Sequence, residues 1–126
     1  FEIPPEYGAL ILEIAVDKYN QGLIEVSLAL FHFLTLVNPH DPDYWFRFGL
    51  IAIENHDYPL ALSAMNKTSY LAPDFIGSHI YAAFSYHKMN ESKRAKQELD
   101  TAKEHLTEEL SEEWKTQVQE VEQLIS

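Results

Sequence analysis

Apolar and polar residues recur along the chain with a helical period, and the pattern predicts seven helices. Apolar residues three and four positions apart mark six segments, at 6–21, 24–37, 43–55, 58–71, 75–88 and 91–105, and a seventh at 108–125. Pro4 and Pro5 precede the first segment, where proline suits the start of a helix. We therefore expect one all-α domain that spans residues 1–126.

The third segment raises a question about burial. Its residues 44–53 read YWFRFGLIAI, which leaves a helix almost no polar face. A helix that is apolar all round must be buried on more than one side. Packing against one partner helix would cover only one side, so the sequence requires a second surface here.

A repeat of 34 residues organises the chain. Pro39 and Pro73 are 34 residues apart, and other landmarks keep the same step. Small residues, large apolar residues and turn residues recur in four series: Ala15, Gly49 and Ala83; Ser27, Ala61 and Ala95; Phe31, Met65 and Leu99; Gly22, His56 and Asn90. The small residues allow two helices to approach closely, and the large ones fill the space between them. His56 fits the turn series poorly, since Gly or Asn is usual there.

This period is that of the tetratricopeptide repeat, a pair of antiparallel helices. The middle unit follows the W-x2-L-G pattern with Trp45, Phe48 and Gly49, whereas the third unit carries His79 in the Trp place and Thr107 in the Pro place. We expect three tandem repeats, at about 8–41, 42–75 and 76–109, in a right-handed superhelical stack with a concave groove.

The seventh helix has one apolar stripe. Its apolar residues recur at helical spacing between glutamates: Leu110, Trp114, Val118, Val121 and Ile125. We interpret it as a capping helix that covers the open end of the third repeat. The alternative is a helix that binds a partner protein.

The first helix of each repeat should line the groove with its second side. The 34-residue step predicts nine groove residues: Leu12, Val16 and Tyr19; Phe46, Leu50 and Ile53; Ile80, Phe84 and His87. Eight of these nine are apolar or aromatic. Some of them must pack against adjacent repeats, but a continuous apolar strip predicts a binding surface. A ligand in the groove would supply the missing cover, and His87 could donate a hydrogen bond to a peptide carbonyl.

Composition excludes several classes of function. The net charge of -11 argues against nucleic acid, which requires clustered Lys and Arg. No apolar run is long enough to span a membrane, and no signal-peptide pattern is visible, so we expect a cytosolic protein. The absence of cysteine removes disulfides and thiolate chemistry.

We also expect no enzyme, cofactor or metal site. The pairs His79 with His87 and His32 with His40 lack the spacing that places two imidazoles on one metal. The four glycines form no phosphate-binding loop, and no nucleophile elbow occurs.

The predicted groove favours an extended apolar segment. Tetratricopeptide domains that bind acidic chaperone C-termini use Lys and Asn where this chain has residues such as Leu12, Phe46 and Leu50. A carboxylate would lose its hydration there without compensation. Three aliphatic anchors at ~2 kcal/mol each give ~6 kcal/mol before main-chain hydrogen bonds and ordering costs, which predicts roughly micromolar affinity.

The chain resembles the class II chaperones of bacterial type III secretion, the SycD/LcrH family. The resemblance rests on the three ordered repeats, the Tyr-Asn-Gln-Gly turn at 19–22, the apolar second repeat, the HIYAA start of the third repeat at 79–83, and the final acidic helix. It covers nearly the whole chain. Residue identity outside these places is modest.

The resemblance implies a function, partners and a location. Family members hold a pore-forming translocator in the bacterial cytosol before export, with an extended N-terminal segment of Pro-x-Leu-x-x-Pro type in the groove. The family also implies weak homodimers through the N-terminal region and contact with the secretion gatekeeper protein. The alternative is a structural tetratricopeptide scaffold, or a needle-subunit co-chaperone, in a permanent complex.

Overall fold

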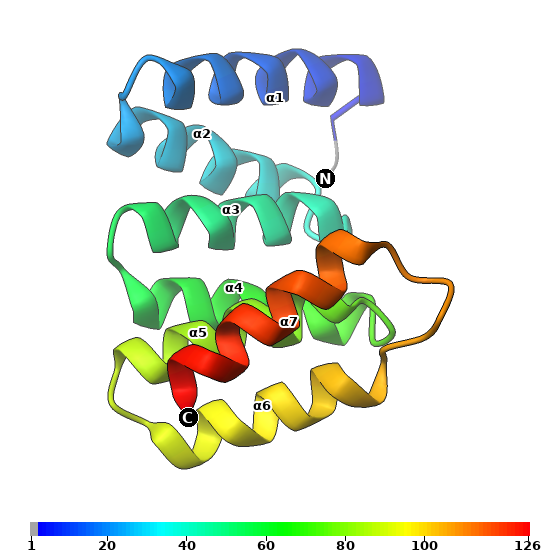
Figure 1. Cartoon of the computed structure of the whole chain (residues 1–126). Coiled ribbons are helices and arrows are strands. Elements are labelled where there is room, and N and C mark those ends of the chain that lie inside the picture. Colours follow the sequence, from blue (N-terminus) through cyan, green and yellow to red (C-terminus); the bar gives the residue numbers. More distant parts are fainter. Residues whose placement is uncertain (1–2) are drawn as a thin grey trace.

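The structure is a computed structural model that describes residues 3–126. In this part of the chain seven helices and no strand occur: α1 (Pro5–Asn20), α2 (Ile24–Val37), α3 (Pro42–Glu54), α4 (Tyr58–Leu71), α5 (Ile76–Lys88), α6 (Ser92–Glu104) and α7 (Glu112–Ile125). The first six agree with the predicted helices to within one residue at each end. They form three antiparallel pairs stacked in chain order (Figure 1), which confirms the all-α tetratricopeptide fold.

The seventh helix begins later than predicted. Residues 105–111 form a connection with a turn, and the amide of Leu110 donates to the carbonyl of Thr107 at 3.3 Å. Ser111 has an extended backbone, and Glu112 and Glu113 occupy the first helical turn. Acidic residues stabilise the positive N-terminal end of a helix, and these two glutamates therefore support the start at Glu112.

The turns within the three pairs repeat the same backbone geometry. Three residues have positive φ angles at the 34-residue step: Gly22 at 80°, His56 at 57° and Asn90 at 61°. The residue after each one donates a 2.9 Å amide hydrogen bond to the carbonyl five residues earlier: Leu23 to Lys18, Asp57 to Ala52 and Glu91 to Tyr86. The sequence deviation at His56 therefore leaves the left-handed turn intact.

The small residues of the repeat are buried where helices approach each other. Ala15, Ala83 and the small residues of the second helices are 0% exposed: Ser27, Ala61 and Ala95. At Gly49 an added Cβ would lie 2.7 Å from Met65 Cε and 3.2 Å from Ala64 Cβ. The absence of a side chain at residue 49 is therefore what allows α3 to pack so closely on α4.

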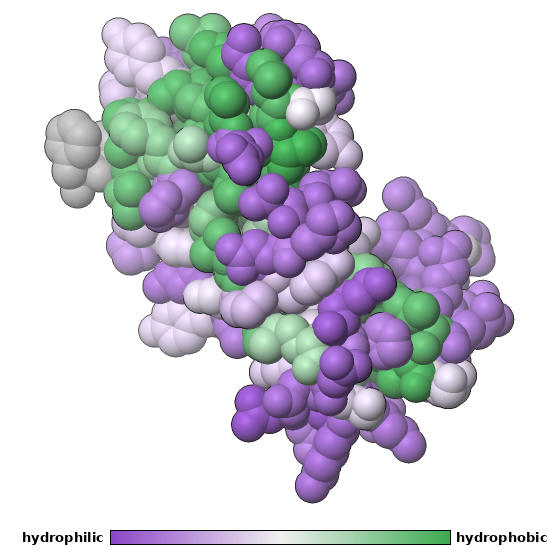
Figure 2. All heavy atoms as spheres, turned by 90° about the vertical axis from the view of Figure 1, so that its left-hand side faces the viewer, coloured by the Kyte–Doolittle hydropathy of each residue, from purple (hydrophilic) through white to green (hydrophobic). Residues whose placement is uncertain are grey.

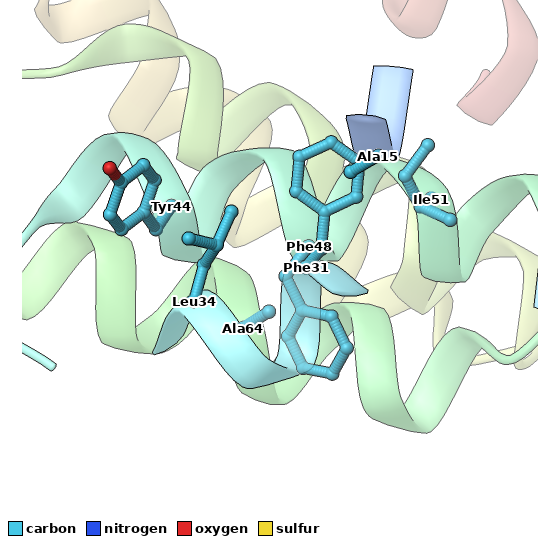
Figure 3. Packing of buried hydrophobic residues seen from close by; sticks show 7 residues of the cluster. All are labelled: Ala15, Phe31, Leu34, Tyr44, Phe48, Ile51 and Ala64. Carbon is cyan, nitrogen blue, oxygen red and sulfur yellow. The ribbon is translucent and has the colours of Figure 1, made fainter. Parts of the chain in front are cut away.

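Two apolar clusters hold the stack together. The first joins α1 to α4 and contains the seven residues shown in Figure 3: Ala15, Phe31, Leu34, Tyr44, Phe48, Ile51 and Ala64. The second joins α5, α6 and α7 through Ile76, Ile80, Ala83, Leu99, Ala102 and Val118. The capping helix thus belongs to the core of the third repeat.

The third repeat adds an ion pair at the position where the second repeat has Trp45. Trp45 donates its indole N–H to the carbonyl of Pro39 at 2.8 Å. His79 stands in the Trp45 place, and its Nδ1 lies 2.9 Å from Glu98 Oε2 on α6. This hydrogen bond raises the pKa of His79, burial opposes the rise, and the carbonyl of Pro73 supports it. The ring of His105 stacks on that of His79 at 5.4 Å and faces Asp74.

We expect the variant Gly49→Val to destabilise the protein by about 1–3 kcal/mol, because the new side chain overlaps Met65 and Ala64. Denaturant unfolding followed by circular dichroism measures this change. Ala9→Val introduces the same side chain at an exposed position of α1 and should cost at most about 0.5 kcal/mol. Helix propensity does not explain a loss at residue 49, because valine is a better helix former than glycine. Equal costs at the two positions would contradict close packing at Gly49.

The pair of His79 and Glu98 should make stability depend on pH. Because the folded state raises the pKa of His79, the contribution of the pair is complete below the ordinary value of 6.5 and is lost as the pH rises through the raised pKa. We expect the difference in unfolding free energy between the parent and His79→Gln to shrink as the pH increases across this range. A difference that grows with pH, or does not change, would contradict the assigned ion pair.

Candidate functional site

The centre of the predicted groove is a row of three apolar residues, one from each first helix. Val16 on α1 is 36% exposed, and Leu50 on α3 and Phe84 on α5 are half-buried. They stand at equivalent positions, 34 residues apart. This row is the part of the predicted site that offers apolar surface without being enclosed.

A second row of predicted residues serves mainly to join neighbouring helices. Leu12 packs against the first apolar cluster. Phe46 makes edge-to-face contacts with Phe75 and Tyr81, with ring centroids 4.8 and 5.8 Å apart. Ile80 is only 1% exposed and belongs to the cluster that includes α7. Ile80 is therefore almost enclosed, although it borders a cleft between α5 and α7.

The remaining predicted residues lie near the C-terminal ends of the first helices. Tyr19 is 36% exposed, and Ile53 and His87 are half-buried. The structure thus keeps some exposure at eight of the nine predicted residues. Phe75 and Tyr81 cover α3 at Phe46, so packing between repeats supplies part of the second surface that the sequence requires for this helix.

A pocket beside Phe46 was not predicted from the sequence. It has a volume of about 250 Å³ and a mostly apolar lining from the start of α3, the end of α4 and the α4–α5 turn: Pro42, Asp43, Phe46, Thr68, Ala72 and Phe75. Its size and chemistry suit one aliphatic or proline side chain. Of these six residues only Phe46 was among the predicted groove residues. Phe75 precedes α5, so it is not at one of the helical positions from which the groove was predicted.

Helix α7 lies against the groove side of α5 as well as on α6. Tyr81 donates its hydroxyl to Gln117 Oε1 at 3.1 Å, and Trp114 meets Phe75 edge to face at 5.6 Å. Gly77 is required there, because an added Cβ would lie 2.8 Å from the Trp114 ring. The predicted cap is thus also a wall beside the third repeat.

A second apolar surface covers the first repeat. Within residues 3–126, nine of the eleven exposed large apolar side chains lie between residues 7 and 36: Tyr7, Leu10, Ile14, Val16, Tyr19, Leu23, Val26, Phe33 and Leu36. Figure 2 shows hydrophobic residues gathered at the end of the molecule that carries α1 and α2, whereas the opposite end is mostly hydrophilic. We call residues Tyr7, Leu10, Ile14, Val26 and Phe33 the first-repeat surface.

The sequence of α2 explains this surface. Only four of its fourteen residues are polar, and two of these, Ser27 and Thr35, are buried. Ser27 donates its hydroxyl to the carbonyl of Ala15 at 2.8 Å, so it serves the α1–α2 contact. The outer side of α2 therefore has few polar groups, a signal that a count of polar residues per helix could have found.

The described residues 3–126 contain no cluster of three or more His, Cys, Asp or Glu side chains placed to hold a metal ion. Over the same residues, no helix has both the length and the apolar character that a membrane crossing requires.

Comparisons with known proteins identify the fold. No family model matches the sequence, and no curated protein matches it. Among solved structures, the Yersinia enterocolitica type III secretion chaperone SycD, in complex with a peptide of the translocator YopD, matches with a TM-score of 0.89 at 19% identity, over 99% of this chain and 96% of the other.

Two further structures share the fold but have different ligands. The CopN–Scc3 complex matches with a TM-score of 0.86 at 22% identity, over 97% of this chain and 71% of the other. The first tetratricopeptide domain of Spaghetti (RPAP3), bound to the HSP90 peptide SRMEEVD, matches with a TM-score of 0.80 at 12% identity, over 99% and 98%. The fold alone therefore does not select a ligand, and the chemistry of the groove must do so.

Proposed function

We propose that this protein is a type III secretion chaperone that holds an extended apolar segment of a translocator protein in its groove, in the bacterial cytosol, before export. The observation that carries the proposal is the apolar row of Val16, Leu50 and Phe84 together with the pocket beside Phe46. The match to SycD with its bound YopD peptide supports it, because that match extends over 99% of the chain.

The groove chemistry favours this ligand over an acidic peptide. The HSP90 peptide in the RPAP3 structure carries several carboxylates, which need cationic or amide donors. Here the corresponding row is apolar, and Arg47 on α3 is already paired with Asp43 at 2.9 Å. Lys88, at one end of the row, lies on the face of the Phe84 ring. A segment with aliphatic and proline side chains would instead bury its anchors without leaving a charge unpaired.

We propose two further binding partners, and the first-repeat surface offers an interface for the first of them, a second copy of this protein. An isologous homodimer would cover it with a second copy of the same surface. The resemblance to the SycD/LcrH family also implies contact with the secretion gatekeeper protein, and Scc3, which shares the fold, is solved in complex with CopN.

The second candidate function is a structural scaffold in a permanent complex. The exposed apolar side chains of α1 and α2 favour it, since permanent interfaces are large and apolar. A scaffold would bury this surface in a stable assembly and would not need to release an extended segment. Reversible peptide binding in the groove separates the two functions.

Peptide titrations test the groove. We expect a labelled peptide with the Pro-x-Leu-x-x-Pro pattern to bind with about 1–100 μM affinity, little affected by salt because apolar contacts are not screened. Val16→Glu should weaken binding by about tenfold or more, since it places a charge beside an apolar anchor. Fluorescence anisotropy measures both.

The matched control is Ile14→Glu. Residues 14 and 16 are two positions apart on α1, so their side chains point about 160° away from each other. Both are exposed, at 43% and 36%, so both variants should remain folded, which circular dichroism checks. Equal weakening by the two variants, or no binding by the parent protein, would contradict a peptide site in the groove.

Self-association tests the first-repeat surface. We expect the parent protein to form a weak dimer that the double variant Ile14→Glu/Phe33→Glu converts to a monomer, because four carboxylates would meet in the dimer interface. Sedimentation velocity over a range of concentrations measures this. Val16→Glu adds one carboxylate at the edge of this surface and should weaken the dimer much less than the double variant does. A dimer that survives the double variant would place the interface elsewhere.

A further inference from the structure

Helix α7 presents one polar stripe toward the groove side of α5. Glu113, Gln117 and Glu120 form this stripe and are spaced by three or four residues, and the apolar Leu124 follows on the same face. Gln117 accepts the hydrogen bond from the Tyr81 hydroxyl, which fixes the direction of this face.

A cleft separates this stripe from α5. It has a volume of about 310 Å³, with Phe84, Val121 and Leu124 among its apolar walls and Tyr81, Gln117 and Glu120 as its polar part. Phe84 belongs to the central row of the groove, and the ring of Tyr81 contacts that of Phe46 at 5.8 Å. The cleft therefore continues the candidate groove at its third-repeat end.

The carboxylates beside the cleft differ from the other glutamates of α7. Glu112 pairs with Lys115 at 3.2 Å, and Glu122 pairs with Lys103 on α6. Within residues 3–126, Glu113 and Glu120 form no ion pair. Partial burial raises the pKa of the half-buried Tyr81, and the charges of Glu113 and Glu120 raise it further.

One basic side chain of the protein lies near this end of the groove. Lys88 Nζ sits 5.5 Å from the centroid of the Phe84 ring. The ring thus already accepts an ammonium group on its face, an arrangement that is favourable for aromatic rings. Lys88 makes no ion pair with Glu113 or Glu120, so both carboxylates are available to a ligand.

We propose that the cleft between α5 and α7 is a subsite for one Lys or Arg side chain of the bound segment. This inference rests on the proposed peptide-binding function. The aliphatic stem of such a residue would lie on Phe84, Val121 and Leu124, and its charged end would reach Glu120 and Glu113. The net charge of -11 attracts a basic ligand residue and repels an acidic one as the segment approaches the protein.

The subsite would fix the orientation of the bound segment in the groove, which the apolar row cannot do. The central row would accept aliphatic side chains from either direction along the groove. A cation site at one end fixes which end of the segment lies on the third repeat. Segments with a basic residue beside their apolar anchors should therefore bind in preference to neutral ones.

Paired peptides test the subsite. Each pair shares the Pro-x-Leu-x-x-Pro core and carries, at one flanking position, either Lys or its uncharged counterpart norleucine. We expect one flanking position at which Lys binds more tightly by about two- to fivefold at low salt, with the gain decreasing as salt screens the carboxylates.

Variants of the protein identify the groups responsible. Glu113→Gln/Glu120→Gln should remove the gain for Lys while it leaves the norleucine peptide unchanged. Glu112→Gln/Glu122→Gln makes the same change of net charge on the same helix, away from the cleft, and should keep most of the gain. Lys88→Met removes the nearby cation and should enlarge the gain.

The outcomes separate this inference from the proposed function. If neutral peptides bind and Val16→Glu abolishes binding, but Lys gives no gain at any position, the subsite is wrong and the peptide groove stands. A gain that persists in Glu113→Gln/Glu120→Gln would also overturn the subsite. If no peptide of the panel binds to the parent protein, both proposals fail.

Discussion

The close approach of successive helices is the constraint on which the structure depends. It requires residues without large side chains at fixed points, and the 34-residue step places Ala15, Gly49 and Ala83 there. A Cβ at Gly49 would already meet Met65 at 2.7 Å. Because each repeat packs only on its neighbours, this local distance sets the orientation of every following helix. The positions of the groove residues, and the seat of α7 on α5, follow from it.

The stack leaves two apolar surfaces with different origins. The groove row arises because each first helix turns one apolar side away from its partner helix, and Phe75, Tyr81 and α7 then cover part of that side. The first-repeat surface arises because no earlier repeat covers α1 and α2 in the described residues, although α2 is as apolar as an internal helix. A reversible peptide site and a self-association surface can therefore coexist on one small domain, since Val16 and Ile14 face different directions on the same helix.

The sequence predicted the first six helices and the 34-residue register of the small and turn residues, because both follow from local periodicity. It was wrong about the start of α7: periodicity continues through Leu110, but the chain turns at 107–110 and the helix begins after Ser111. It also did not reveal that α7 buries Ile80 or that Phe75 and Tyr81 flank Phe46. Those contacts depend on where one helix lies on another, which residue spacing within a single helix does not encode. The nine groove residues remain a prediction as a binding site.

The most direct test of the account is to locate a bound peptide. A Pro-x-Leu-x-x-Pro peptide with a photoreactive leucine analogue at its central anchor can be cross-linked to the protein and mapped by mass spectrometry. We predict cross-links to Val16, Leu50, Phe84 or the pocket residues beside Phe46. Cross-links to Leu10, Ile14 or Phe33 instead would show that the first-repeat surface binds the peptide, and would contradict the assignment of the groove as the client site.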